Sequence, residues 1–121
     1  LVEFADAWTG PAEAGLAASA RTPRFLDLRY ERLLADQPRH VAELLEFIGA
    51  AADPARVAAC IDAASFRSLS GGRSPGQEDN RSFFRKASPG DWVNWLSPRQ
   101  VATIQSGPRA DLMVRLGYTL A

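Results

Sequence analysis

Residues 25–30 read Phe25-Leu26-Asp27-Leu28-Arg29-Tyr30, and this stretch decides the fold class. It follows Pro23 and is short, apolar and aromatic, which is typical of a strand buried on both faces, as in a parallel sheet. No other segment of the chain predicts a strand as strongly. Because one strand cannot form a sheet, the sequence predicts an α/β protein whose other strands lie outside this chain.

Amphipathic helices are predicted after this strand. The first has Asp36 as its N-cap and ends before Gly49, and its apolar stripe is expected to be buried. That stripe consists of Val41, Leu44, Leu45 and Ile48. The second helix begins at Asp53-Pro54 and repeats the spacing with Val57, Cys60, Ile61 and Ala64. A capping box at 97–100 starts a final helix that is interrupted at 107–108, and residues 1–20 predict one or two short helices. The chain is therefore expected to be mostly helical, with one buried strand.

The composition limits the classes of partner. Of the 121 residues, 46% are hydrophobic and 23% are charged, which fits one small globular domain. Fourteen basic residues balance fourteen acidic ones, so binding to nucleic acid or to a membrane surface is not expected, although a local basic pocket is compatible. A single cysteine excludes a disulfide framework. Without an initiator Met or a secretory leader, the chain is expected to be cut from a longer cytoplasmic protein, and its Ala- and Arg-rich composition suits a bacterial gene.

The candidate chemistry lies in a basic segment that follows a polar loop. Residues 70–82 are rich in turn formers, and a loop of that length is typical of a lid or binding segment. It leads into Phe83-Phe84-Arg85-Lys86-Ala87-Ser88-Pro89-Gly90-Asp91-Trp92-Val93-Asn94. Arg85 can offer a phosphate a planar fork of donors, and Lys86 a mobile point charge. Such a pair is most often a solvated surface feature, but the aromatics before it and the turn after it favour an anion site.

Aromatic side chains near this segment could bind a base. Phe83 and Phe84 can offer ring faces or edges, and base–aromatic stacking contributes about 1–3 kcal/mol per base. We expect one of these two rings to pack in the core instead. Tyr30 directly follows the predicted strand, where open α/β sheets bind their ligands. Ligand contact and core packing fit Tyr30 equally well.

Three ordered blocks of the chain resemble the sulfotransferases that use 3′-phosphoadenosine 5′-phosphosulfate (PAPS). The basic segment resembles the signature of that family, Arg-Lys-Gly-x-x-Gly-Asp-Trp-Lys-Asn. Residues 28–34, with Tyr30 and Glu31, resemble its Tyr-Glu-Asp-Leu segment, and Ala64-Ser65-Phe66 resembles its Thr-Ser-Phe segment. Residues 96–98 and 112–118 fit its last helix, so the resemblance covers most of residues 24–118.

The resemblance implies both a fold and a reaction. The chain would be the C-terminal part of a P-loop-like, parallel-sheet sulfotransferase domain. The complete enzyme would transfer a sulfuryl group from PAPS to a hydroxyl or amine acceptor. This chain would supply the adenine and 3′-phosphate side of the donor site. The cofactor-binding residues implied in this way are Arg85, Lys86 and Ala87 near the phosphate, and Phe83, Phe84, Tyr30 and Phe66 around the adenine.

Departures from the family signature bear on the affinity of this site. Ala87 replaces a glycine, which adds strain if its φ angle is positive. Pro89 removes a backbone N–H from the turn, and Val93 stands where a lysine is common. Asp91 is expected to fix the turn, and the tryptophans that follow it, Trp92 and Trp95, to anchor the turn to the core.

Several parts of such an enzyme are not recognisable in the sequence. The loop that cradles the 5′-phosphosulfate, two further 3′-phosphate ligands and the catalytic base all have no counterpart. The single histidine, His40, lies off the apolar stripe and is expected to be exposed and without a role in proton transfer. We therefore predict no catalytic residue in this chain, which would be inactive alone and would depend on a missing N-terminal part of the domain. No metal-ligand spacing occurs, so no metal is predicted. The small-molecule acceptor is not identified.

Two alternatives remain. The chain could be a truncated or degenerate module that binds a nucleotide or a partner without catalysis. It could also belong to a different class of nucleotide-binding protein that shares only a basic loop.

Overall fold

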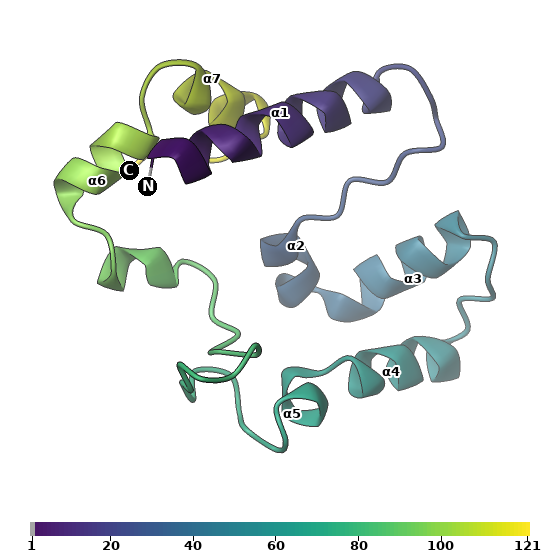
Figure 1. Ribbon diagram of the computed structural model, residues 1–121. Coiled ribbons are helices and arrows are strands. Elements are labelled where there is room, and N and C mark those ends of the chain that lie inside the picture. The colour runs from purple at the N-terminus through teal and green to yellow at the C-terminus, as the bar shows by residue number, and fades with distance from the viewer. Residues whose placement is uncertain (1) are drawn as a thin grey trace. The chain divides into compact units, whose positions relative to one another are not determined.

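The computed structural model describes residues 2–121, which form helices joined by loops (Figure 1). The chain divides into two compact units. One contains residues up to Phe25 together with Asp91–Ala121, and the other contains Leu26–Gly90. The basic segment of the sequence is therefore split, because residues 83–90 belong to one unit and residues 91–94 to the other.

The unit that contains both ends of the chain is built around its long first helix. Helix α1 (Val2–Ser19) packs against α6 (Pro98–Ile104) and α7 (Gly107–Arg115), and a 3-10 turn, η1 (Asp91–Asn94), precedes them. Leu112 on α7 is fully buried in this unit. Arg109 pairs with Asp6 of α1, which links helices that are distant in sequence. The predicted capping box at the start of α6 is confirmed, since Ser97 and Gln100 bond to each other's backbone amides.

The other unit is a short series of helices. It consists of α2 (Tyr30–Ala35), α3 (Gln37–Phe47), α4 (Pro54–Ala63) and α5 (Phe66–Leu69). Helices α3 and α4 pack together and run antiparallel, as Figure 1 shows. Their predicted N-caps are confirmed: Asp36 accepts a hydrogen bond from the Arg39 amide at 3.3 Å, and Asp53 accepts one from the Arg56 amide at 3.0 Å.

The predicted strand is not formed, and the α/β, parallel-sheet class is wrong for the part of the chain that the structure describes. Residues 25–29 are irregular, and Tyr30 already belongs to α2. Arg29 has extended backbone angles, with φ −91° and ψ 132°, so the local preference for extended backbone is present. A strand, however, is defined by hydrogen bonds to a neighbouring strand, and residues 2–121 contain none. The expectation of a mostly helical chain is confirmed.

The histidine of α3 is less exposed than the sequence predicted. The side chain of His40 is only 16% exposed, and its Nδ1 lies 2.9 Å from Oε2 of Glu43. The Arg39 guanidinium donates to Oε1 of the same carboxylate at 2.9 Å. The hydrogen bonds from Arg39 and then from His40 lower the pKa of the Glu43 carboxyl below its ordinary value. His40 thus takes part in a local network on one helix.

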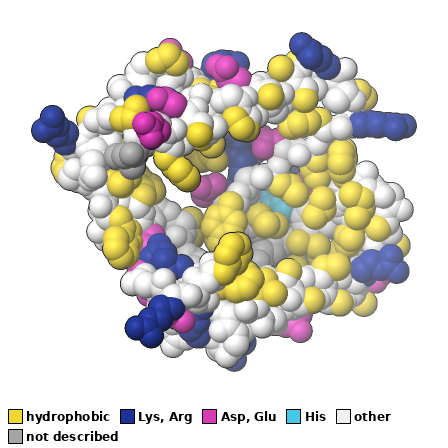
Figure 2. Space-filling model, in the orientation of Figure 1, with side chains coloured by type: hydrophobic (Ala, Val, Ile, Leu, Met, Phe, Trp, Pro, Cys, Tyr) yellow, Lys and Arg dark blue, Asp and Glu magenta, His cyan; other side chains and the backbone are white. Residues whose placement is uncertain are grey.

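The helices of the second unit leave much of their apolar surface uncovered. Val57 is its one buried hydrophobic residue, while Leu44 and Ile48 of the predicted buried stripe are 38% and 64% exposed. Figure 2 shows hydrophobic side chains gathered over this group of helices. The stripe was predicted to be buried, but none of its four members is: Val41 and Leu45 are half-buried, and Leu44 and Ile48 are exposed. Among residues 2–121, no helix is long and apolar enough to cross a membrane.

Candidate functional site

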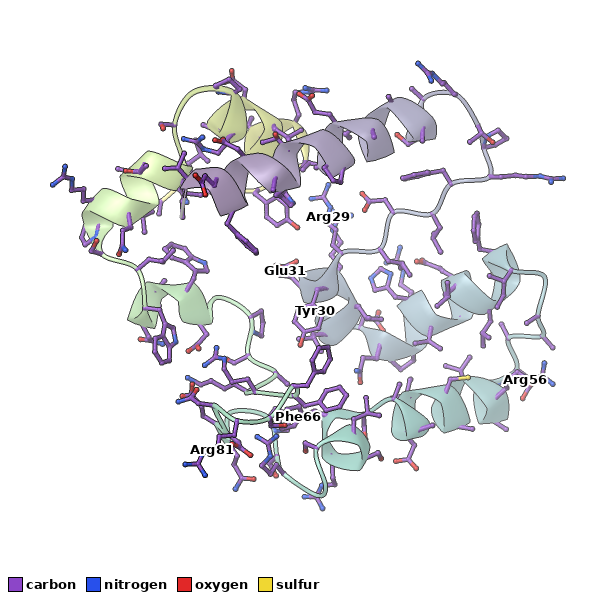
Figure 3. All side chains as sticks on the ribbon, viewed as in Figure 1. Arg29, Tyr30, Glu31, Arg56, Phe66 and Arg81 are labelled. Atoms are coloured by element: carbon purple, nitrogen blue, oxygen red, sulfur yellow. The ribbon has the colours of Figure 1, made fainter. Side chains whose placement is uncertain are left out.

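An open pocket of about 770 Å³ lies within the second unit. Its walls come from α2, from α5 with the turn before it, and from residues 83–88. Figure 3 labels Tyr30 and Phe66, which belong to two of these walls. Every candidate site residue of the sequence lines the pocket: Tyr30, Phe66, Phe83, Phe84, Arg85, Lys86 and Ala87. The fold therefore brings together side chains from three separate segments.

The aromatic residues are arranged as an open wall. Phe83 is 94% exposed, and its ring meets that of Phe84 edge to face, with centroids 5.2 Å apart. Phe84 and Phe66 are half-buried, and Tyr30 is 49% exposed. One phenylalanine of the pair was expected to pack in the core; Phe84 is the more buried of the two, and both rings line the pocket. Accessible ring faces of this kind can stack on a planar base.

The two cations of the basic segment share an acidic partner. The Arg85 guanidinium donates to Oε1 of Glu78, and Lys86 Nζ lies 3.8 Å from Oε2 of the same carboxylate. Arg85 and Lys86 both line the pocket. Their side chains are partly shielded from solvent, at 38% and 22% exposure. They can offer charge-assisted hydrogen bonds to an anion at the pocket wall.

The long polar loop folds back onto the basic segment. The Gly76 amide donates to the Lys86 carbonyl at 2.8 Å, and the Asp79 amide donates to the Arg85 carbonyl at 3.0 Å. The loop is therefore ordered by backbone pairing with the segment it precedes. This pairing places Glu78 opposite the two cations. From its length and composition the loop was expected to be a lid or binding segment, and no role was predicted for any residue in it.

Arg73 holds this arrangement together, and the sequence analysis did not predict its role. Its guanidinium lies over the Phe66 ring, 5.1 Å from the centroid. The same group donates to four acceptors within the loop and the basic segment: the Gln77 carbonyl (2.9 Å), the Arg85 carbonyl (3.0 Å), the Ser82 hydroxyl (2.9 Å) and the Phe84 carbonyl (2.5 Å). Arg73 thus connects the aromatic wall to the backbone of the cation pair. The one feature of the sequence that could have indicated this role is the position of an arginine in the middle of a Gly- and Ser-rich loop.

Ala87 has the backbone conformation that its family glycine would favour. Its φ angle is +50°, and it is the one non-glycine residue with positive φ among residues 2–121. A Cβ atom in this region costs roughly 1–2 kcal/mol, because it approaches the following carbonyl oxygen. The strain inferred conditionally from the sequence is therefore present.

The end of the basic segment lies in the other unit. Asp91 is buried and accepts hydrogen bonds from the Asn94 amide group at 3.0 Å and from the Trp95 indole at 2.9 Å. It fixes the turn, as predicted. The tryptophan rings are not core anchors, since Trp92 and Trp95 are 41% and 58% exposed. In residues 2–121, no group of three His, Cys, Asp or Glu side chains is placed to hold a metal ion.

Comparison with models of protein families assigns the chain to a family. Residues 7–113 match the sulfotransferase domain family. The chain belongs to this family, whose members are transferases. The match begins earlier in the chain than the resemblance seen at residues 24–118. No solved structure matches the chain.

Replacing Arg73 should loosen the loop that frames the pocket. Arg73→Lys keeps the charge but cannot reach four acceptors, so the Phe84 carbonyl loses its Arg73 donor and the Arg85 carbonyl keeps only the Asp79 amide. Leaving a carbonyl such as that of Phe84 unpaired costs about 1–3 kcal/mol, and we expect amide hydrogen exchange of Gly76 and Asp79 to accelerate about tenfold or more. Arg81→Lys is the control, because the Arg81 side chain extends away from Phe66 (Figure 3). Equal exchange rates in the two variants would show that Arg73 does not hold the loop.

Replacing Ala87 by glycine should stabilise the second unit. Relief of the strained φ angle exceeds the larger chain entropy of glycine, so we expect the free energy of unfolding to rise by about 0.5–1 kcal/mol. The same substitution at Ala59, an exposed position within α4, should instead lower it by about 1 kcal/mol. Urea unfolding followed by circular dichroism measures both changes. A loss of stability in Ala87→Gly would contradict the strain.

Proposed function

We propose that this chain forms the nucleotide side of a sulfotransferase donor site that binds PAPS. The observation that carries the proposal is the convergence of a cation pair and several aromatic side chains on one pocket. In this arrangement Arg85 and Lys86 bind the 3′-phosphate, and Tyr30, Phe66, Phe83 and Phe84 surround the adenine. Membership of the sulfotransferase domain family supports the same assignment.

The residues of the pocket fit a ligand of this kind. Its volume of about 770 Å³ is within the range of about 300–1,000 Å³ that is usual for small-molecule sites. It combines apolar walls with charged donors at one side, which suits a molecule that has a planar base and a charged phosphate. When bound, the donor supplies an activated sulfuryl group. The described residues of this chain bind and orient the nucleotide.

The reaction needs groups that the pocket does not supply. Its lining includes no His, Asp or Glu side chain that could deprotonate an acceptor hydroxyl or amine. We propose that this base and the ligands of the sulfate belong to a further, N-terminal part of the domain. That part would also cover exposed apolar side chains such as Ile48. In this account the isolated chain binds the nucleotide and does not turn it over, in the cytoplasm of the cell.

Binding measurements with nucleotide analogues test the proposal. The protein should bind 3′-phosphoadenosine 5′-phosphate at least about tenfold more tightly than adenosine 5′-monophosphate, because the 3′-phosphate gains charge-assisted hydrogen bonds from Arg85 and Lys86. Arg85→Ala should abolish most of this preference, whereas Arg81→Ala, which removes the same charge from a side chain directed away from Phe66, should retain it. Isothermal titration calorimetry gives the dissociation constants.

Equal affinity of the unmodified protein for the two nucleotides would contradict the proposal. It would favour a different class of nucleotide-binding protein that shares only the basic loop. If Arg85→Ala still prefers the 3′-phosphorylated nucleotide, the 3′-phosphate binds at a site that does not include Arg85.

A further inference from the structure

The Glu78 carboxylate contacts Arg85 and Lys86, the two cations that the proposed function assigns to the 3′-phosphate. One of its oxygens accepts from the Arg85 guanidinium, and the other lies 3.8 Å from Lys86 Nζ. An anion with two oxygens, each directed at a different cation, is the arrangement that a bound phosphate would also adopt. The structure thus already contains an anion in this position, and it belongs to the chain itself.

The placement of Glu78 is imposed by the fold of the loop. The amide of Asp79, the next residue, donates to the Arg85 carbonyl, and the Gly76 amide donates to the Lys86 carbonyl. These backbone bonds flank Glu78 on both sides and set it opposite the cation pair. The contact is also partly shielded, since the Glu78 side chain is 29% exposed. Shielding strengthens such a pair relative to one in open solvent.

We propose that Glu78 is an exchangeable counterion that sets the affinity of the site, because the 3′-phosphate of the nucleotide must displace its carboxylate from Arg85 and Lys86. This inference rests on the proposed function. A phosphate carries more charge and more acceptor oxygens than a carboxylate, so it can win this competition. Small free anions that bind the cations more weakly than Glu78 are kept out. While the nucleotide is bound, the Glu78 carboxylate competes with its 3′-phosphate for the two cations. This competition promotes release of the nucleotide.

The exchange has two consequences that a purely structural role lacks. A ligand without a 3′-phosphate does not displace Glu78, so its affinity is independent of this residue. Binding of the phosphate replaces one anion by another at the cations, which weakens the dependence of affinity on salt. Without the carboxylate, the phosphate no longer displaces Glu78 from the cations, and its affinity depends on salt more steeply.

The substitution that tests this exchange preserves the size of the side chain. Glu78→Gln removes the charge and keeps an oxygen that can accept from Arg85. The loop retains its backbone pairing and the four hydrogen bonds of Arg73. Glu46→Gln removes the same charge from an exposed position on α3 and is the matched control. Glu78→Asp shortens the side chain and draws the carboxylate away from the cations.

Calorimetric titrations at low and high salt concentration measure the effect. We expect Glu78→Gln to bind 3′-phosphoadenosine 5′-phosphate about three- to tenfold more tightly at low salt, which corresponds to removal of one partly shielded ion pair. Adenosine should bind with the same affinity within about twofold, since a ligand without a phosphate does not disturb the pair. The dependence of affinity on salt should be steeper than in the unmodified protein. Glu78→Asp should fall between the two, and Glu46→Gln should match the unmodified protein.

Unchanged or weaker binding of the nucleotide to Glu78→Gln and Glu78→Asp would overturn the inference, because it would make Glu78 a residue that positions the cations. An equal gain in Glu46→Gln would also overturn it, since net charge alone would then explain the effect. The proposed function is tested separately in the unmodified protein. It fails if that protein binds nucleotides with and without the 3′-phosphate with equal affinity.

Discussion

The guanidinium of Arg73 connects the two kinds of surface that make up the candidate site. It covers the Phe66 ring on one side and holds the Phe84 and Arg85 carbonyls on the other. A buried or half-buried carbonyl must find a donor, and the planar fork of arginine can serve several at once. Because the carbonyls of the basic segment turn toward Arg73, the segment is held in one conformation. The pocket, the cation pair and the position of Glu78 all depend on this contact.

The same contact gives the loop its order without regular secondary structure. Residues 70–82 contain no helix or strand, and their conformation comes from Arg73 and from two backbone hydrogen bonds to the basic segment. The strained φ angle at Ala87 lies within that segment, directly after Lys86. Strain of this type persists where the surrounding structure determines the backbone, and it is common at binding sites. Order and strain thus occur together at the pocket wall.

Features that depend on neighbouring residues could be predicted from the sequence. Asp36, Asp53 and Ser97 cap their helices as expected, because an N-cap is decided within one turn. Seven of the sixteen pocket residues were also named from the sequence, through the resemblance of the basic segment and of the stretches around Tyr30 and Phe66. Membership of the sulfotransferase domain family agrees with that resemblance. Their roles toward a ligand remain proposals.

Features that depend on distant partners could not be predicted. Residues 25–30 have the composition of a strand, but strand formation requires another strand to pair with, and the described residues offer none. Leu44 and Ile48 lie on an apolar stripe that nothing in the unit fully covers. Arg73 and Glu78 gain their roles only when the loop folds onto residues 84–86. No local pattern encodes that approach.

The central claim is that the pocket of the second unit binds a 3′-phosphorylated adenine nucleotide through Arg85 and Lys86. Chemical-shift mapping by heteronuclear NMR during titration with 3′-phosphoadenosine 5′-phosphate tests it most directly. The account predicts that the largest shifts occur at residues 83–88, Tyr30 and Phe66, and that adenosine reproduces the shifts of the aromatic residues but not those of Arg85 and Lys86. Shifts concentrated in residues 91–121, or identical maps for the two ligands, would contradict it.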